Sequence, residues 1–403
     1  MVISSTILGG GLGGCTPFLP EGRVAAFSEL EDWDQQDFRD VLSLFRQFCA
    51  FKEKQNTQIR VSEIADKQDV YLKSICHSAL ALPSNPDAHE ARVFFENHFT
   101  PYEVKGNAER NGKGFLTGYY EPEFSGSLIR SGDYQYPLYS PPPGYISVAR
   151  DAKLSGIPEG RTAARVVRDS SGKDIYLSIP TRGEIEQGAL QDLIQPIVYF
   201  KEPGHAFIIH VQGSARIRLP DNSTLRVAFA GRNGHPYSSI GKVLVQKGEI
   251  ALKDMSLENL LGWLRDYPEK AQDIMNHNQS FIFFRIADEL ADAQGPVGAA
   301  GMPLVPELSL AVDHTLWSYG LPVWLEGTLP GQHKEQQKVA NLHLALDTGA
   351  AITGPARADY FWGSGDRAGF RAGLTSQNMR FVVLLPKSLF INAVSSTQKT
   401  QTD

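Results

Sequence analysis

The sequence predicts a mainly β protein that begins with helices and has one β domain inserted into another. Over the first hundred residues, apolar side chains recur at helical spacing. From about residue 122, short apolar runs alternate with turn residues, and such runs resume after a helical stretch near residue 260. No low-complexity linker divides the chain, which favours insertion over two domains in series.

Three helices are predicted before residue 100. The first covers about 25–54, where Phe, Trp and Leu side chains recur mostly at helical spacing. The second begins near Val61 and stops before Pro83. The third starts at Ser84-Asn85-Pro86, because a capping residue is followed there by proline at the first helical position. We interpret all three as packing elements.

The remaining chain is expected to form two β units. A strand signal over Gly114–Glu121 ends at Pro122. Short apolar runs within 122–269 indicate an inserted small antiparallel barrel or sandwich; they lie at 197–200, 206–212, 215–219 and 224–229. A helix capped by Ser256 is expected over 256–275. Buried strands of a second β unit follow at 281–284, 321–325, 342–346 and 381–385, and residues 392–403 are expected to form a frayed tail.

Composition and charge exclude several classes of protein. The chain has 403 residues, 42% of them apolar, and a net charge of −6 with dispersed lysine and arginine, which predicts a globular protein with no nucleic-acid partner. Its three cysteines show no CxxC spacing, so we expect no metal site and no cofactor. Cys49 and Cys76 fall in helical patterns and are expected to be buried small apolar residues; a disulfide between them would require export.

The first twenty residues allow two interpretations. The segment ending in Leu12-Gly13-Gly14-Cys15 resembles the lipobox at which bacterial lipoproteins are cut and acylated. However, the first basic residue is Arg23, and fourteen residues are few for a signal peptide. Residues 1–20 are therefore either a signal or lipoprotein segment, or a frayed tail. The chain contains no apolar run of the 18 to 20 residues that a membrane-spanning helix needs.

Candidate chemistry is concentrated in the last hundred residues, where carboxylates stand beside glycines. The three sites are Asp347-Thr348-Gly349, Asp359-Tyr360-Phe361-Trp362-Gly363 and Gly365-Asp366-Arg367. Glycine lets backbone approach a ligand, and aromatic residues can stack on sugar faces, although aspartate in such stretches also commonly caps turns. Spacing alone does not choose among the three.

Other catalytic schemes fit less well. Asp347-Thr348-Gly349 matches the motif of aspartic proteases, but that chemistry needs two such carboxylates, and the chain has no second D-T-G or D-S-G, so a homodimer would be required. There is no G-x-S-x-G, no H-E-x-x-H and no glycine-rich loop between a strand and a helix.

Taken together, the motifs resemble the membrane-bound lytic murein transglycosylase A family. Seven segments match in order between about residues 115 and 363. They are Leu116-Thr117-Gly118-Tyr119-Tyr120-Glu121-Pro122; Val211-Gln212-Gly213-Ser214-Ala215; Ala230 to Gly241; Asn278 to Phe284; Gly295 to Leu304; Ser309-Leu310-Ala311-Val312-Asp313; and Asp347-Thr348-Gly349 through Arg357 to Gly363.

This resemblance implies a double-psi β-barrel with an inserted smaller β domain and a glycan groove between them. The barrel would comprise residues 21–121, with the N-terminal helices, and 270–391; the insert would comprise 122–269. The family's C-terminal 3D region is named for three aspartates, which Asp313, Asp347 and Asp359 resemble. Asp359 matches the catalytic acid, and Asp347 would be its hydrogen-bonding partner. The expected sugar-binding residues are Thr117, Gly118, Tyr119, Tyr120, Glu121, Gln212, Gly213, Ser214 and Asp313.

The implied activity is cleavage of the β-1,4 bond between N-acetylmuramic acid and N-acetylglucosamine in peptidoglycan, forming 1,6-anhydromuramic acid. One carboxyl suffices because the attacking hydroxyl is already attached to the sugar. Asp359 would then need a raised pKa, for which Tyr360, Phe361 and Trp362 are suitable neighbours. The implied location is the bacterial cell envelope, in the periplasm, with outer-membrane anchoring through Cys15 if the lipobox is real. Two alternatives stay open: a non-catalytic peptidoglycan-binding protein on the same fold, and the dimeric aspartic protease.

Overall fold

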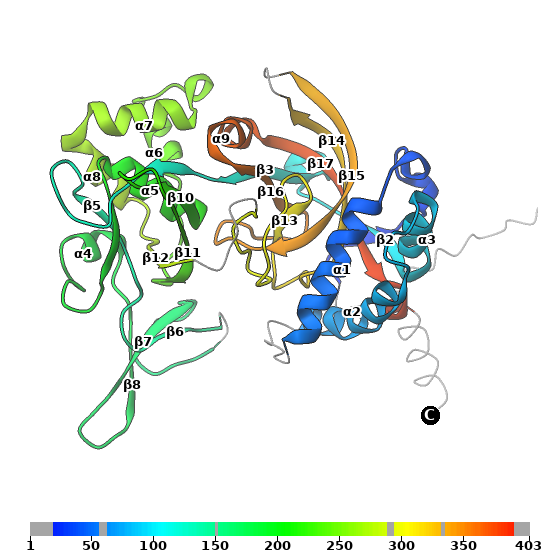
Figure 1. Cartoon of the computed structure of the whole chain (residues 1–403), viewed down its shortest axis with the longest axis horizontal. Helices are drawn as coiled ribbons and strands as arrows, with labels where there is room; N and C mark the ends of the chain where they lie inside the picture. The colour runs from blue at the N-terminus through cyan, green and yellow to red at the C-terminus, as the bar shows by residue number, and fades with distance from the viewer. Residues whose placement is uncertain (1–18, 56–62, 150–151, 288–293, 332–334, 391–403) are drawn as a thin grey trace, which may run out of the picture.

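The computed structural model describes residues 19–55, 63–149, 152–287, 294–331 and 335–390. Cys15 and the expected tail at 392–403 lie outside these ranges. Figure 1 shows three regions: a central barrel, a group of N-terminal helices against one side of it, and an inserted region on the other side. No helix in the described ranges has the length and apolar character needed to cross a bilayer.

The central region is a closed six-stranded barrel, the expected double-psi β-barrel. Its hydrogen-bonded order is β17-β14-β15-β13-β16-β3, and pairing of β3 with β17 closes it. Two pairs, β13–β15 and β16–β3, are parallel. The strands are β3 (Gly114–Glu121), β13 (Ser309–Val312), β14 (Pro322–Pro330), β15 (Gln336–Asp347), β16 (Arg357–Ser364) and β17 (Ser376–Pro386). One barrel strand therefore precedes the insert and five follow it.

Helices and two short strands cover one side of the barrel. They are β1 (Gly22–Val24), α1 (Arg39–Lys54), α2 (Glu63–Ala81), α3 (Ala88–His98) and β2 (Phe99–Val104), with β1 and β2 extending the barrel sheet beyond β17. The helices and the barrel share one apolar core; Trp33, for example, lies 5.1 Å from Trp324 between ring centroids. Burial against the barrel, rather than intrinsic propensity, holds these helices.

Two predicted helix starts are wrong. The expected helix over 25–54 begins only at Arg39, because the preceding segment forms β1 and two single 3₁₀ turns at Phe27–Glu29 and Trp33–Gln35. The third helix is capped by Asp87 rather than by the Ser84 segment. The Asp87 side chain accepts from Glu90 N, and Glu90 bonds back to Asp87 N, so two free helix-end donors are satisfied.

The expectation for the cysteines is also wrong: Cys49 of α1 and Cys76 of α2 form a disulfide. Both residues are buried, as expected, but the two helices pack side by side and bring the sulfurs together. Helical patterns alone do not show which faces of two helices meet.

The inserted region is built around a four-stranded sheet of order β12-β11-β10-β4. Its strands are β4 (Glu123–Ser125), β10 (Ser214–Arg218), β11 (Thr224–Arg232) and β12 (Ile282–Ile286). The strand expected near 281–284 therefore belongs to the insert sheet and not to the second β unit, because β12 pairs with β11. The exact limits of the two domains stay a prediction.

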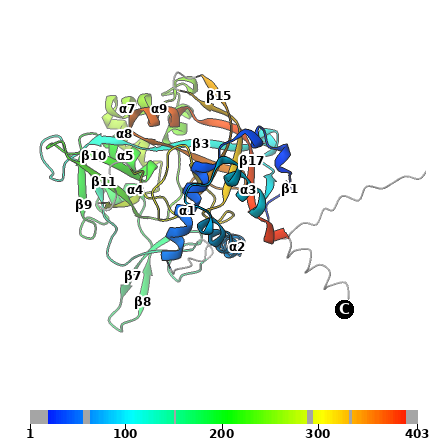
Figure 2. The same cartoon turned by 45° about the vertical axis from the view of Figure 1, so that its right-hand side comes forward.

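Two further sheets and a layer of helices complete the insert. The two-stranded sheet pairs β5 (Tyr136–Tyr139) with β9 (Pro196–Phe200). The other consists of β6 (Tyr145–Ser147), β7 (Ala163–Arg168) and β8 (Asp174–Leu177), and its β7–β8 hairpin projects from the molecule in Figures 1 and 2. The helices are α4 (Arg182–Glu186), α5 (Pro203–Gln212), α6 (Ile240–Gln246), α7 (Leu257–Asp266) and α8 (Pro268–Asn276).

Residues 206–212 form the helix α5, not the predicted strand. Pro203 stands at its first turn and Gly213 ends it at φ 83°, so both helix-end signals were present. The run looks like a buried strand because the helix is apolar nearly all round, a case that periodicity cannot separate from a strand. The helix expected over 256–275 keeps its Ser256 cap, which accepts from Asn259 N, but divides before Pro268 into α7 and α8.

Candidate active site

Asp359 lies in the middle of β16, where pairing with two neighbouring strands fixes its position. It is in register with Thr117 of β3 on one side and with Ala311 of β13 on the other. The Thr117 hydroxyl donates to Asp359 Oδ1 at 2.6 Å. The side chain is half-buried, so the carboxyl is held by the barrel and still reachable from outside.

Burial raises the pKa of Asp359 to about 6. The nearby Arg357 and the hydrogen bond from Thr117 act against this rise, while the neighbouring Asp347 adds to it. A carboxyl group with this pKa is about half protonated near pH 6 and about a tenth protonated at pH 7, so it can both supply and take up a proton, as a group that serves as acid and then as base must do.

The aromatic residues after Asp359 contribute differently from expectation. Tyr360 and Trp362 point to the opposite face of β16, because side chains alternate along a strand. Their rings pack together at 4.6 Å, the Tyr360 hydroxyl donates to Glu307 O, and Trp362 Nε1 donates to Thr375 Oγ1. Phe361 shares the face of Asp359 and lies 5.2 Å from the ring of Tyr119. Of the three aromatic residues, only Phe361 is placed to line the site.

Asp347 is the second carboxylate of the site. It ends β15 and is also in register with Ala311, so the two aspartates flank β13 on opposite sides, two strand spacings or about 10 Å apart along the sheet. Both of its oxygens are engaged: Ala299 N donates to Oδ1 at 2.9 Å and the Tyr119 hydroxyl donates to Oδ2 at 3.0 Å. Burial raises the pKa of Asp347 as well.

Asp313 is placed apart from this pair and organises a loop. Its Oδ1 accepts from both the backbone and the hydroxyl of Thr315, and its Oδ2 accepts from Gly354 N at 2.7 Å. The side chain is only 9% exposed. With both oxygens engaged by protein, Asp313 is better suited to shape the segment before β16 than to bind a sugar.

The predicted sugar-binding residues of β3 divide by strand alternation. Thr117 and Tyr119 face the two aspartates, as their hydrogen bonds show. Gly118 and Tyr120 face the other way. A Cβ on Gly118 would lie 2.7 Å from Trp362 Nε1, so glycine is needed there for packing. The ring of Tyr120 lies against Gly369 of α9 (Gly365–Leu374).

Glu121 and several residues of the insert hold the end of β3 in place. Glu121 is fully buried, forms ion pairs with Arg216 at 3.0 Å and Arg226 at 2.8 Å, and accepts from the Ser364 hydroxyl. Because β10 and β11 carry the arginines, this cluster joins the insert to the barrel. Gln212 Oε1 accepts from Tyr120 N at 3.2 Å. Gly213 and Ser214 follow as the cap of α5 and the buried first residue of β10.

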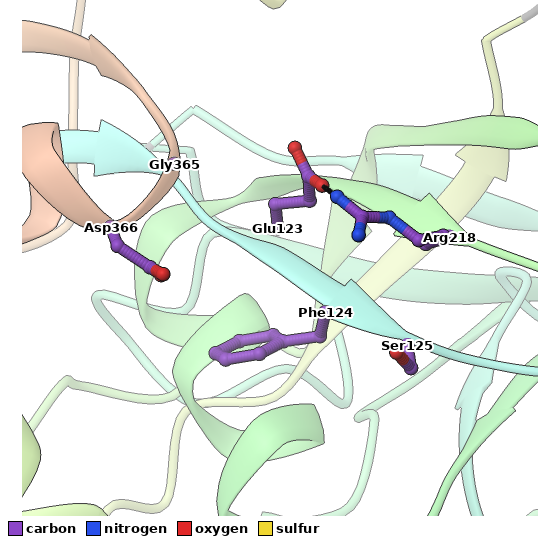
Figure 3. Close-up of a pocket in the computed structure, with 6 residues that line it drawn as sticks. All are labelled: Glu123, Phe124, Ser125, Arg218, Gly365 and Asp366. Atoms are coloured by element: carbon purple, nitrogen blue, oxygen red, sulfur yellow. Dashed lines mark hydrogen bonds and ion pairs between the residues drawn. The ribbon is translucent and has the colours of Figure 1, made fainter.

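Asp366, the third aspartate singled out by the sequence, lies elsewhere. Asp366 follows the end of β16, in the first turn of α9. There Asp366 lines a polar pocket of about 250 Å³ with Glu123, Phe124, Ser125, Arg218 and Gly365. Figure 3 shows Glu123 and Arg218 directed toward one another across this pocket, where they form an ion pair. The pocket is separate from the two aspartates.

Sequence reasoning missed three residues that surround the carboxylates. Arg357 lies two positions before Asp359 on the same face of β16, a spacing that could have been used. Tyr237 of the insert is influenced by the charge of Asp359, and Tyr319 by that of Asp347; burial together with these charges raises the pKa of both phenols. No local signal in the sequence indicates that these tyrosines approach the aspartates.

Comparison with known proteins identifies the family of this chain. Residues 115–285 match the model of the MltA specific insert domain, and residues 308–385 match the 3D domain. The chain is 33% identical over 283 residues to membrane-bound lytic murein transglycosylase A of Escherichia coli strain K12. This alignment covers 69% of this chain and 67% of the Escherichia coli protein. This chain belongs to the membrane-bound lytic murein transglycosylase A family.

Solved structures of lytic murein transglycosylases share the fold of this family member. The membrane-bound lytic murein transglycosylase of Agrobacterium tumefaciens is 30% identical and superposes with a TM-score of 0.77, covering 92% of this chain and 99% of that one. MltA of Escherichia coli with bound chitohexaose is 26% identical, with a TM-score of 0.60 and coverage of 91% and 92%. The chain is therefore a lytic murein transglycosylase, an enzyme of peptidoglycan breakdown.

In its described residues, no cluster of three His, Cys, Asp or Glu side chains could hold a metal ion.

Proposed function

We propose that this transglycosylase cleaves the β-1,4 bond between N-acetylmuramic acid and N-acetylglucosamine and leaves 1,6-anhydromuramic acid ends, with Asp359 as its only acid and base. The observation that carries the proposal is a half-buried carboxyl, fixed between two strands, with a pKa raised to about 6. Such a group donates a proton readily near neutral pH.

In this mechanism Asp359 first donates a proton and later takes one up. Neutral Asp359 protonates the glycosidic oxygen as the bond from muramyl C1 breaks, and the N-acetylglucosamine part leaves as an alcohol. The muramyl C6 hydroxyl then bonds to C1, and its proton passes to the Asp359 carboxylate, which restores the acid. The attacking group is part of the substrate, so orientation takes the place of a second catalytic residue.

Asp347 has a supporting part in this proposal. Both Asp347 oxygens accept hydrogen bonds from protein groups, which hold this carboxylate in place and suit a supporting residue. Its charge helps Asp359 to keep its proton. Tyr119 donates to Asp347 and so holds that carboxylate in place. The ring of Phe361 lies 5.2 Å from the ring of Tyr119 and limits access of water.

We further infer that the enzyme works in the cell envelope, where its polymer substrate lies. The disulfide between Cys49 and Cys76 supports this location, because such bonds persist in oxidising compartments outside the cytoplasm. The name of the Escherichia coli relative includes "membrane-bound". Acylation at Cys15 would provide the anchor; substitution of Cys15 by alanine should then move the protein from the membrane to the soluble fraction of the cell. An unchanged distribution would remove Cys15 as the anchor.

The decisive experiment identifies the product. Purified murein sacculi are digested in heavy-oxygen water, and the released muropeptides are analysed by mass. If C6 is the nucleophile, new muramic ends carry the anhydro ring and no label. Reducing, labelled ends would show that water attacks, would require a second catalytic carboxylate, and would overturn the single-acid mechanism even if Asp359 were essential.

A further inference from the structure

Arg357 and Asp359 are joined through one hydroxyl group. Arg357 Nη2 donates to Thr117 Oγ1 at 2.7 Å, and Thr117 Oγ1 donates to Asp359 Oδ1 at 2.6 Å. Arg357 and Asp359 lie on the same face of β16, and Thr117 stands opposite Asp359 on β3. The three side chains therefore form a chain of two hydrogen bonds built on two paired strands.

The chemistry of the donors fixes the direction of the bond from Arg357 and favours that of the bond from Thr117. A guanidinium can only donate, so Arg357 must use a lone pair of the Thr117 oxygen. The single proton of Thr117 is then left to point at Asp359 Oδ1. Without the arginine, the hydroxyl could instead accept a proton from neutral Asp359, which would place the acid proton on Oδ1 and turn it toward Thr117.

We propose that Arg357 is a positioning residue, which sets the direction of the bond from Thr117 to Asp359 and so keeps the acid proton on Oδ2. This inference rests on the proposed role of Asp359 as acid and base, and it adds a residue that acts on the proton without touching the sugar. Arg357 itself is held over the ring of Phe115, 5.2 Å from its centroid, and donates to the Ala358 carbonyl.

The charged and titratable groups around Asp359 come from four parts of the chain. Arg357 of β16 favours the carboxylate, whereas Asp347 of β15 disfavours it. Burial and nearby carboxylates raise the pKa of Tyr119 of β3 far above its normal value and raise that of Tyr237 of the insert as well. Both phenols are therefore neutral at the working pH. Arg357 is thus the cation that opposes the effects of burial and of Asp347.

The first test titrates the carboxyl directly, without substrate. In protein labelled with carbon-13 at aspartate carboxyls, the Asp359 signal is identified by its loss in D359N. Arg357→Met removes both charge and donor, and should move the midpoint of the Asp359 titration upward by about one pH unit. Arg357→Lys keeps the charge and one donor group and should restore most of the wild-type midpoint.

The matched control is Arg110→Gln. Arg110 lies over the same Phe115 ring, 3.7 Å from its centroid, but donates to Asn378 rather than to Thr117. If Arg357 acted only by packing on this ring, both arginines would matter equally. The R110Q variant should titrate at the wild-type midpoint.

The second test separates orientation from charge by rate. At about pH 5, where the acid form is well populated in every variant, R357M should lower kcat on soluble peptidoglycan oligosaccharides about 10-fold with little change in KM. In a Thr117→Val background the same substitution should cost less than about 2-fold, because the hydroxyl to be oriented is absent.

An unmoved Asp359 titration in R357M, or an equal loss of kcat in both backgrounds, would overturn the proposal. Should R357M fail to fold, Arg357→Gln carries the titration test, since it keeps a donor but no charge. The two proposals fail separately: the titration reads the effect of Arg357 without any product, and product analysis of the unmodified enzyme tests the reaction without Arg357.

Discussion

Two carboxyl groups on either side of β13 have different surroundings, and the proposed mechanism gives them different parts. Asp359 accepts from a hydroxyl that an arginine orients, and its pKa is raised to about 6. Asp347 accepts a backbone N–H and a phenol, one on each oxygen. In the proposed mechanism the first group exchanges a proton with the substrate, whereas the second acts through its charge.

Asp359→Asn should reduce murein cleavage by at least about 100-fold, because an amide matches the carboxyl in size but cannot cycle a proton. Release of muropeptides from sacculi measures the loss, and circular dichroism checks the fold. Residual activity above about a tenth of wild type would move the acid to another residue, with Asp347 the first to test.

The same substitution should change how stability depends on pH. The pKa of Asp359 is higher in the folded protein than in an unfolded chain, so ionisation above pH 4 disfavours folding, and the penalty grows as pH rises through 6. D359N should therefore raise Tm relative to wild type at pH 8 and have less effect at pH 4. Equal Tm differences at both pH values would contradict the buried-acid description.

Asp347→Asn should move the basic limb of the pH–rate profile downward. Asp347 raises the pKa of Asp359, so removing its charge lowers that pKa and the acid form disappears at lower pH. This direction is opposite to the one expected for R357M. A profile of kcat against pH measures it, with Asp366→Asn, whose carboxyl lies in the separate pocket, as the control that leaves the limb in place.

The helical layer depends on a covalent connection that its sequence pattern does not reveal. α1 and α2 contribute residues to the core that continues into the barrel, and Cys49–Cys76 ties them 27 residues apart in sequence. The bond restricts the unfolded chain more than it adds contacts to the folded one. The helices therefore rely both on burial against the barrel and on a cross-link between them.

Replacing both cysteines by alanine should lower the free energy of unfolding by about 3 to 4 kcal/mol, the value expected for a loop of this length. Urea unfolding of wild type and of the double variant measures the difference, and a reducing agent should destabilise wild type by a similar amount. Activity at low temperature should persist, because neither cysteine contributes a hydrogen bond to the two aspartates. A loss of activity without a loss of stability would contradict a purely stabilising role for the disulfide.

At the scale of the whole molecule, the position of the insert depends on how it is fixed to the barrel. β3 leaves the barrel at Glu121, and the buried carboxylate there meets arginines of β10 and β11 and the Ser364 hydroxyl at the end of β16. This cluster stands where two domains meet, so it sets the position of the insert relative to Asp359. A buried charge left without its partner is costly, which opposes separation of the insert from the barrel.

Glu121→Gln should destabilise the protein by about 3 kcal/mol, because two arginines lose a buried partner. It should also lower kcat/KM on sacculi, since the insert would be less firmly placed. Glu123→Gln is the matched control: its pair with Arg218 is partly exposed, unlike the fully buried Glu121, and should contribute less than about 1 kcal/mol. Equal effects of the two substitutions in urea unfolding would show that Glu121 is not the joint.

The sequence by itself determined the fold class, about half of the described strands and the candidate aspartates. Short apolar and β-branched runs indicated β3, β9, β10 and β11 and the central parts of β14, β15 and β17, but not β13 or β16. Ordered motifs indicated the family and Asp359, because runs and motifs both depend on local residue types. Tertiary structure decided the rest. It made residues 206–212 a helix, paired β12 with the insert sheet, joined Cys49 to Cys76 and turned Glu121 into a domain joint. Each of these depends on which faces meet across long stretches of sequence, and local periodicity carries no information about such meetings. For the same reason, Arg357 was visible in the sequence, but its bond to Thr117, 240 residues away, was not.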